Sequence, residues 1–416
     1  MDTTIVLVVV VVFSFVVSRV LERYGRLSAL STALYLSVGG VVGPQVLGGL
    51  TSEALSHLQP VLSMLLGMLG FGLGLRLRTH LGRAASVPYQ IMGALVVMVL
   101  VGAACFGFLT FALPGLALEA QLGVSATMGT VACLVSVATL DQAMAQLKAR
   151  GPVTSSLRSF AVVSEVVAIL SFGVVAAFVR SNYTALKWLG ELTATEWVVG
   201  SALVGLLSGG LFTVFIGKES SSSRIFLATV GIVIFASGVA SGLGVSPLFV
   251  SLIAGASVAA LSSQTARLEV EVDRLQQPIF VLLFILAGAM WTPVPWVFVA
   301  FVPIYIGVRV MGFRLGSWVV ASELSEGRRG YGGALLSQSA FAVAVSLNFL
   351  QISPAHAPLV LTTVLMAVVL QEPLAPGLVR RALADAEEID VTFEALAEGV
   401  DPVDGGLMSL GEEEGA

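Results

Sequence analysis

Four charged residues lie within or beside long apolar stretches, and they are the first candidates for chemistry. Glu165 is near the middle of the apolar run 155–179, Arg309 and Arg314 lie in a second run, and Asp141 follows a third. A charge inside a bilayer is costly and usually functional. A carboxylate in a water-accessible cavity binds a proton or, because hard cations prefer oxygen ligands, a monovalent metal ion. A purely structural ion pair between Glu165 and Arg309 is the alternative interpretation.

Two further segments carry polar side chains near their centres. They read LVSVATLDQAMAQ (134–146) and GALLSQSAFAVAV (333–345), and their polar residues are Ser136, Thr139, Asp141 and Gln142 in the first, and Ser337, Gln338 and Ser339 in the second. Transporters build ion sites from interrupted helices in corresponding places of two inverted halves. The pattern is typical of such helices, although hydrogen bonding between neighbouring helices is the better explanation of each patch taken on its own.

The composition of the chain requires a membrane around these residues. Of the 416 residues, 56% are hydrophobic and 11% are charged, whereas soluble domains carry roughly 25% charged residues. Runs long enough to cross about 30 Å of hydrocarbon predict about thirteen spans. Their centres are near residues 11, 38, 67, 100, 133, 167, 205, 232, 253, 284, 307, 341 and 365. We therefore expect an all-α integral membrane protein with about thirteen transmembrane helices.

The positive charges predict how these spans cross the membrane. Seventeen of the 21 Lys and Arg residues fall in alternate gaps or after the last span, whereas the other gaps hold only Arg180 and Lys187. By the positive-inside rule, the N-terminus lies outside and the C-terminus is cytoplasmic. Residues 3–18 are predicted to form the first helix, because no basic start or cleavage site marks them as a signal peptide. The expected location is the cell membrane.

The domain organisation predicted from these patterns is simple. Residues 1–384 form one transmembrane domain, with segments 1 to 6 and 8 to 13 as inverted halves. Residues 385–416 hold eleven acids and no Lys or Arg, which predicts a disordered cytoplasmic tail. The chain shows no cofactor motif, no basic face for nucleic acid, and no arrangement typical of a hydrolytic enzyme around its three histidines.

Six short motifs resemble those of the monovalent cation:proton antiporter superfamily, and most closely its potassium-efflux (Kef-like) branch. They span roughly residues 5 to 380 in the order that the family shows. The motifs are GGVVGPQVLG (39–48), GFGLGLRL (70–77), SEVVAI (164–169), PIFVLLFILAGAMW (278–291), RVMGFRLG (309–316) and LLSQSAFAVAV (335–345).

The resemblance implies a set of site residues and a pair of substrates. Na⁺ or K⁺ would be exchanged for protons by a homodimeric membrane protein without a cofactor. Glu165 would bind the cation or the proton, with Ser164, Thr139 and Asp141 beside it, and Arg309 and Arg314 would be its basic partners. The crossovers of the two broken helices would lie at Ser136, Ala138, Ser337, Gln338 and Ser339.

The sequence departs from the family pattern at several of these positions. Glu165 replaces the usual Asp, Ser164 stands where some members have a second acid, and Ala340 replaces the Glu of the twelfth-segment motif. With a single acid, we expect electroneutral exchange in which Arg309 pairs with Glu165 when no cation is bound. Two other functions fit the same scaffold: a sodium-coupled carrier of organic anions that uses Arg309 and Arg314, and a channel or a sensor that transports nothing.

Overall fold

The computed structural model describes residues 28–81, 87–180, 192–216, 222–262, 264–320 and 328–389. These residues form helices and one isolated antiparallel bridge between Val135 and Gln338. Seven of the helices are long and apolar enough to cross a membrane alone, and the bent pair α16 (Ala357–Gln371) and α17 (Ala375–Ala384) makes an eighth candidate. Each predicted centre from residue 38 onward lies in a helix or, for residue 133, in a break between two. The predicted first helix, 3–18, lies outside the described residues.

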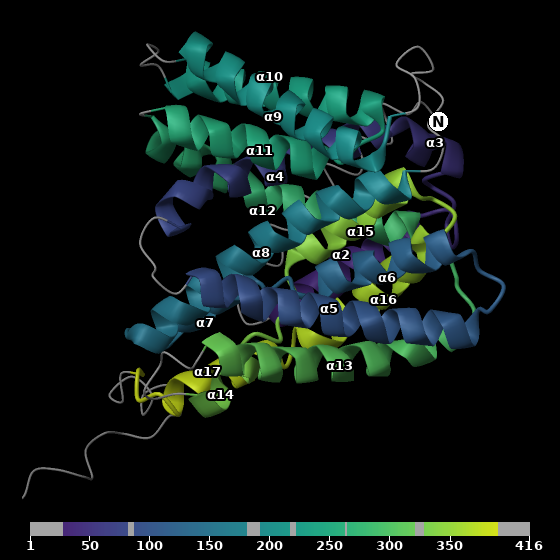
Figure 1. Ribbon diagram of the computed structural model, residues 1–416, viewed down its shortest axis with the longest axis vertical. Coiled ribbons are helices and arrows are strands. Elements are labelled where there is room, and N and C mark those ends of the chain that lie inside the picture. Colours follow the sequence, from purple (N-terminus) through teal and green to yellow (C-terminus); the bar gives the residue numbers. More distant parts are fainter. Residues whose placement is uncertain are drawn as a thin grey trace, which may run out of the picture.

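The helices form two bundles that pack side by side (Figure 1). The first bundle consists of α2 (Ser28–Val42), α3 (Ser52–His57), α4 (Gln59–Leu81), α9 (Ala194–Ile216), α10 (Ser222–Leu243), α11 (Pro247–Leu261) and α12 (Thr265–Met290). The second bundle consists of α5 (Val87–Ala112), α6 (Leu118–Ala132), α7 (Val137–Gln146), α8 (Pro152–Val179), α13 (Trp296–Val320), α14 (Arg328–Ala334), α15 (Ala340–Ile352), α16 and α17. Fewer contacts join the bundles, mainly through α8 and α15.

Glycines in the sequence motifs set the close packing of the first bundle. A Cβ atom at Gly39 of α2 would collide with a backbone carbonyl of α12, and one at Gly288 of α12 would collide with α2. Gly70 and Gly74 of α4 and Gly255 of α11 make the same kind of close approach. Small residues let backbones come together where the surrounding lipid provides no hydrophobic drive for helix association. These glycines therefore allow the helices of the first bundle, which we call the scaffold, to pack closely.

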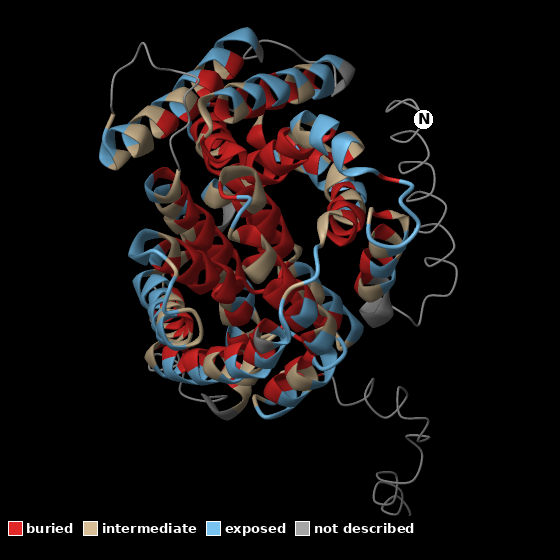
Figure 2. Cartoon of the chain, turned by 90° about the vertical axis from the view of Figure 1, so that its right-hand side faces the viewer, coloured by how far each residue is buried: buried red, intermediate tan, exposed pale blue. Residues whose placement is uncertain are grey.

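Large apolar side chains cover the outside of both bundles. Leu207, Val214 and Phe215 of α9, Leu227 of α10 and Trp318 of α13 are among the most exposed. Buried residues instead gather between the helices, as Figure 2 shows. An apolar exterior of this kind matches a lipid environment, in which backbone polar groups are satisfied within the helices themselves.

The C-terminal segment contacts the beginning of α8. The N-cap residue of α8, Gly151, offers no side chain to its free backbone N–H groups. Glu388 replaces that cap: its Oε1 accepts from the N–H of Val153 (2.7 Å), and its Oε2 accepts from the N–H and hydroxyl of Thr154 (2.7 and 2.6 Å). Residues 385–389 therefore pack with the membrane domain, beyond the predicted boundary at 384. Residues 390–416 of the predicted tail lie outside the described residues.

Candidate cation site

Two broken helices of the second bundle meet at their breaks. The first break separates α6 from α7, and the second separates α14 from α15. The chains run antiparallel there, with the Val135–Gln338 bridge and a hydrogen bond from the N–H of Ser136 to the carbonyl of Ser337 (3.1 Å). Ser136 and Ser339 begin the second halves by accepting N-cap hydrogen bonds, as serine commonly does. Of the five residues predicted for the crossovers, Ser136, Ser337, Gln338 and Ser339 lie at the two breaks, whereas Ala138 lies in the first turn of α7.

Arg309 of α13 fills the space where the first halves of these helices end. Its side chain is fully buried, and all three of its nitrogens donate hydrogen bonds. The acceptors are the carbonyls of Ala132 (2.8 Å), Leu134 (2.8 Å) and Leu336 (2.5 Å) and the amide oxygen of Gln371 (2.5 Å). Unsatisfied carbonyls at a helix C-terminus carry partial negative charge. Arg309 therefore neutralises both breaks at once.

Glu165 lies halfway along α8 and does not contact Arg309. The carboxylate is almost completely buried, with 2% of the residue exposed. Its only hydrogen bond to a described residue comes from the hydroxyl of Ser339, which donates to Oε1 at 2.7 Å. The expected ion pair between Glu165 and Arg309 is therefore absent from this structure. The guanidinium donates instead to backbone carbonyls at the breaks and to Gln371.

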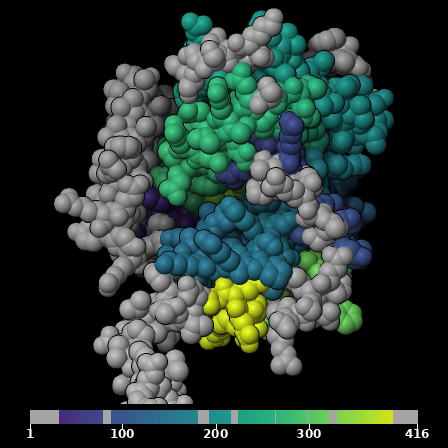
Figure 3. Space-filling view, turned by 90° about the vertical axis from the view of Figure 1, so that its left-hand side faces the viewer, coloured from purple at the N-terminus to yellow at the C-terminus, as the bar shows by residue number. Residues whose placement is uncertain are grey.

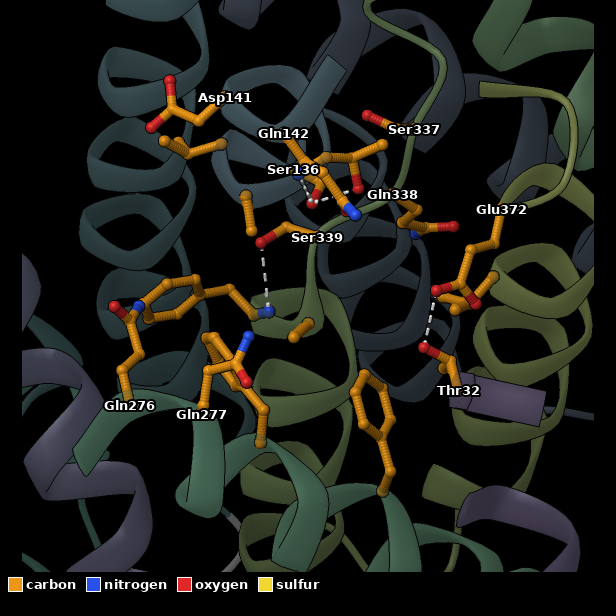
Figure 4. A pocket seen from close by; sticks show the side chains of 18 of the residues that line it. Thr32, Ser136, Asp141, Gln142, Gln276, Gln277, Ser337, Gln338, Ser339 and Glu372 are labelled. Carbon is orange, nitrogen blue, oxygen red and sulfur yellow. Dashed lines mark hydrogen bonds between the residues drawn. The ribbon is translucent and has the colours of Figure 1, made fainter. Parts of the chain in front are cut away.

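Glu165 faces a cavity of about 640 Å³ between the two bundles. Figure 3 looks onto the end at which the cavity opens, where the surface is hollowed between residues of α12 in green and of α7 and α8 in blue. In Figure 4, the serines of the two breaks group on one side of the cavity, and Gln276 and Gln277 of α12 lie across from them. The predicted site residues that line the cavity are Ser136, Ala138, Thr139, Asp141, Gln142, Glu165, Ser337, Gln338 and Ser339.

Three predicted site residues do not line the cavity, and a fourth is neutralised at its edge. The hydroxyl of Ser164 donates to the carbonyl of Ala161 in its own helix (2.8 Å). Arg309 binds the breaks, and Arg314 is exposed on α13. Asp141 lines the cavity but forms an ion pair with Arg158 (2.9 Å), and both side chains are substantially exposed. Asp141 is thus a surface acid at the cavity mouth.

The structure adds polar residues that the sequence did not single out. Tyr305 of α13 accepts a hydrogen bond from the side-chain amide of Gln338 (3.0 Å). Glu372, directly after α16, accepts one from the hydroxyl of Thr32 of α2 (2.7 Å) and also lines the cavity. One signal pointed to Glu372: it follows the otherwise uncharged helix 357–371 and precedes a proline, where a lone acid is easily taken for the end of a span.

A profile described as "Sodium/hydrogen exchanger, transmembrane" matches residues 5–383. The chain belongs to the sodium/hydrogen exchanger family. The resemblance to the cation:proton antiporter superfamily is thereby confirmed, whereas the closeness to its potassium-efflux branch stays a prediction. Membership in this family also supports a protein that crosses the membrane several times.

Comparison with solved structures confirms the predicted fold class for this exchanger-family chain. The structure of the sodium proton antiporter MjNhaP1 from Methanocaldococcus jannaschii at pH 8 is similar, with a TM-score of 0.66. The similarity covers 92% of this chain and 100% of that chain at 14% sequence identity. No curated protein sequence matches the chain.

Proposed function

We propose that this protein exchanges a monovalent cation, Na⁺ or K⁺, for protons across the membrane, with Glu165 binding the cation and the proton in turn. The observation that carries the proposal is the position of Glu165, a buried carboxylate that faces a cavity and has a single hydrogen-bond partner among the described residues. Its family and fold are those of a transporter. A carboxylate with a single hydrogen bond can exchange ligands, because no Lys or Arg among the described residues forms an ion pair with it.

Competition at one carboxylate explains how the two fluxes are coupled. The carboxylate oxygens of Glu165 and the hydroxyls of Ser339 and Thr139 are the hard ligands that a monovalent cation prefers. A proton on Glu165 removes the negative charge that attracts the cation. If the empty, charged form of the site does not change its exposure, then one cation moves in one direction for each proton that moves in the other. Exchange at this site alone is electroneutral.

The cavity opens at the end where the positive-inside rule places the cytoplasm. Arg76 of α4 lies at this end of the cavity, and Arg158 of α8 binds Asp141 at its mouth. We therefore take the structure as the form that is open to the cytoplasm. In alternating access, the second bundle would move against the scaffold of the first and expose Glu165 to the other side of the membrane.

Two polar contacts, one buried and one partly buried, close the opposite side between the two bundles. The hydroxyl of Ser246, the N-cap of α11, donates to the side-chain oxygen of Asn348 of α15 (2.5 Å). The side-chain amide of Gln351, near the end of α15, donates to the hydroxyl of Ser63 of α4 (3.0 Å). Both hydrogen bonds join the moving bundle to the scaffold. Opening to the outside would require them to break.

The organic-anion alternative loses its basis in this geometry. It relied on Arg309 and Arg314 as ligands for a substrate carboxylate. Arg309 binds backbone carbonyls and Gln371, and neither arginine lines the cavity. The cavity also carries more carboxylates than guanidinium groups, which favours a cation over an anion.

The test is cation-induced proton movement in proteoliposomes that contain the full chain. Sodium, potassium and lithium are compared from mildly acidic to alkaline pH, with Glu165→Gln alongside. As a control, Glu387→Gln makes the same chemical change at an exposed acid outside the cavity. Exchange by the unmodified protein and by Glu387→Gln, but not by Glu165→Gln, supports the proposal. No proton movement in any of them would reject antiport and favour a sensor, and persistent exchange in Glu165→Gln would reject Glu165 as the shared site.

A further inference from the structure

Glu372 is a second carboxylate of the same cavity, and the exchange step at Glu165 does not use it. It lies where the chain bends by 55° between α16 and α17. Oε1 accepts the hydrogen bond from Thr32, so this carboxylate joins the second bundle to α2 of the first. Oε2 is buried and has no hydrogen-bond partner in the part of the chain that the structure describes. Such an oxygen has lost its water without gaining a donor, which is unfavourable unless a ligand approaches it.

The charges around the cavity separate its four carboxylates into two kinds. Arg158 pairs with Asp141, and Arg76 pairs with Asp273. The other two carboxylates, Glu372 and the central glutamate of α8, have no ion pair within the described residues. The paired acids are neutralised, so the negative potential of the cavity comes mainly from the unpaired ones. A cavity with two unneutralised carboxylates concentrates cations.

Oxygen atoms on the same side of the cavity as Glu372 could act with it as ligands for a cation. The side-chain oxygen of Gln338 is buried and has no hydrogen-bond partner among the described residues, because the amide nitrogen of this side chain is the group that binds Tyr305. In Figure 4, Gln338 and Glu372 lie on the same side of the cavity, with Thr32 next to Glu372. Carboxylate, amide and hydroxyl oxygens are suitable ligands for a hard cation and poor ones for an anion.

We infer that Glu372, with Thr32 and Gln338, forms an entry site for the transported monovalent cation between the cytoplasmic mouth of the cavity and Glu165. This inference rests on the proposed function. It assigns to Glu372 the capture of the ion, while Glu165 couples the ion to the proton. Capture changes the cation concentration at which exchange is half-maximal, whereas the maximal rate depends on the step at Glu165.

Exchange kinetics in proteoliposomes test the capture role. Glu372→Gln is expected to raise the sodium KM about three- to tenfold with little change in the maximal rate, because the neutral amide keeps the shape of the side chain and removes its attraction for the ion. Glu372→Asp, which keeps the charge, should show a smaller rise. Glu387→Gln should keep the KM of the unmodified protein. An unchanged KM in Glu372→Gln, or an equal rise in Glu387→Gln, would overturn the inference.

A binding measurement separates a failed inference from a failed proposal. Sodium NMR line broadening is recorded for the purified full chain in detergent, in Glu165→Gln and in Glu165→Gln combined with Glu372→Gln. The single variant should retain weak sodium binding, and the double variant should lose it. Equal line broadening in Glu165→Gln and in the double variant would show that Glu372 does not bind sodium, and it would overturn the inference even if Glu372→Gln folds poorly. A difference in broadening, with no exchange by the unmodified protein, would keep the site and reject antiport.

Discussion

Glu165 and Arg309 are buried to almost the same extent, but their surroundings differ. Arg309 donates four hydrogen bonds to the breaks and to Gln371, whereas Glu165 accepts one, from Ser339, and otherwise faces the cavity. A buried charge whose hydrogen bonds are all made within the protein stabilises one arrangement of the chain. A buried charge with hydrogen-bonding capacity left over is available to a ligand. The comparison separates a charge whose nitrogens all donate within the protein from one that stays open to a ligand, although the sequence presents both as single charges within apolar segments.

The largest effect is expected from Arg309→Ala. The substitution leaves three buried carbonyls and one amide oxygen without their donor, and each unmade hydrogen bond of this kind costs about 1–3 kcal/mol. We expect the free energy of unfolding to fall by at least about 3 kcal/mol, seen as a large loss of thermal stability in detergent. Arg309→Lys should recover part of it. A stable Arg309→Ala protein with only an altered pH profile of exchange would instead support pairing with Glu165.

Glu165→Gln is expected to give the opposite result. Exchange should drop to the level of protein-free liposomes, because the amide cannot alternate between a proton and a cation. The free energy of unfolding should change by less than about 1 kcal/mol, because the shape of the side chain is kept and only one hydrogen bond is altered. If this variant unfolds as readily as Arg309→Ala, then Glu165 is structural and the distinction between the two charges fails.

The hydroxyl of Ser339 has two roles. It donates a hydrogen bond to Glu165, and it accepts the N-cap hydrogen bond at the start of α15. Ser339→Ala should lower the free energy of unfolding by about 1–2 kcal/mol and weaken the apparent cation affinity. Ser337→Ala is the matched control two residues earlier, where a buried hydroxyl has no hydrogen-bond partner among the described residues. Removing that hydroxyl should be neutral or slightly stabilising in the same thermal measurement. Equal losses in both variants would show that the contact with Glu165 is unimportant.

The smallest effect concerns the beginning of the helix that carries Glu165. Glu388→Gln weakens the cap on α8 and should lower the free energy of unfolding by about 0.5–1 kcal/mol, seen as a slightly lower unfolding temperature. Glu387→Gln, one residue earlier and exposed, should leave that temperature unchanged. A lower temperature in both variants would point to overall charge rather than to the cap.

Local features of the sequence were sufficient to predict the helices, the two breaks and the central carboxylate. Apolar run length determines where a span lies, and a cluster such as Ser337, Gln338 and Ser339 is visible without knowing its neighbours. The partners of Arg309 were not predictable in this way. Three of them are backbone carbonyls, which every residue possesses, so no residue type marks them.

Contacts between distant parts of the chain were also missed. Thr32 and Glu372 are separated by 340 residues, and nothing in either segment indicates the other. Glu388 was assigned to a solvated tail because its neighbours are acidic, yet it binds the start of α8. In each case a polar group is satisfied by a partner that only the folded chain brings near.

The hydrogen bonds of Arg309 join parts of the chain that are synthesised at different times. The carbonyl of Leu134 receives its donor from a residue that follows 175 positions later. At translation rates of about 5–20 residues per second, roughly 10–35 s separate the two. During that interval, the first break lies in the membrane without its arginine. A nascent chain that stops short of α13 therefore leaves the carbonyls of Ala132 and Leu134 without the donor that they have in the complete protein.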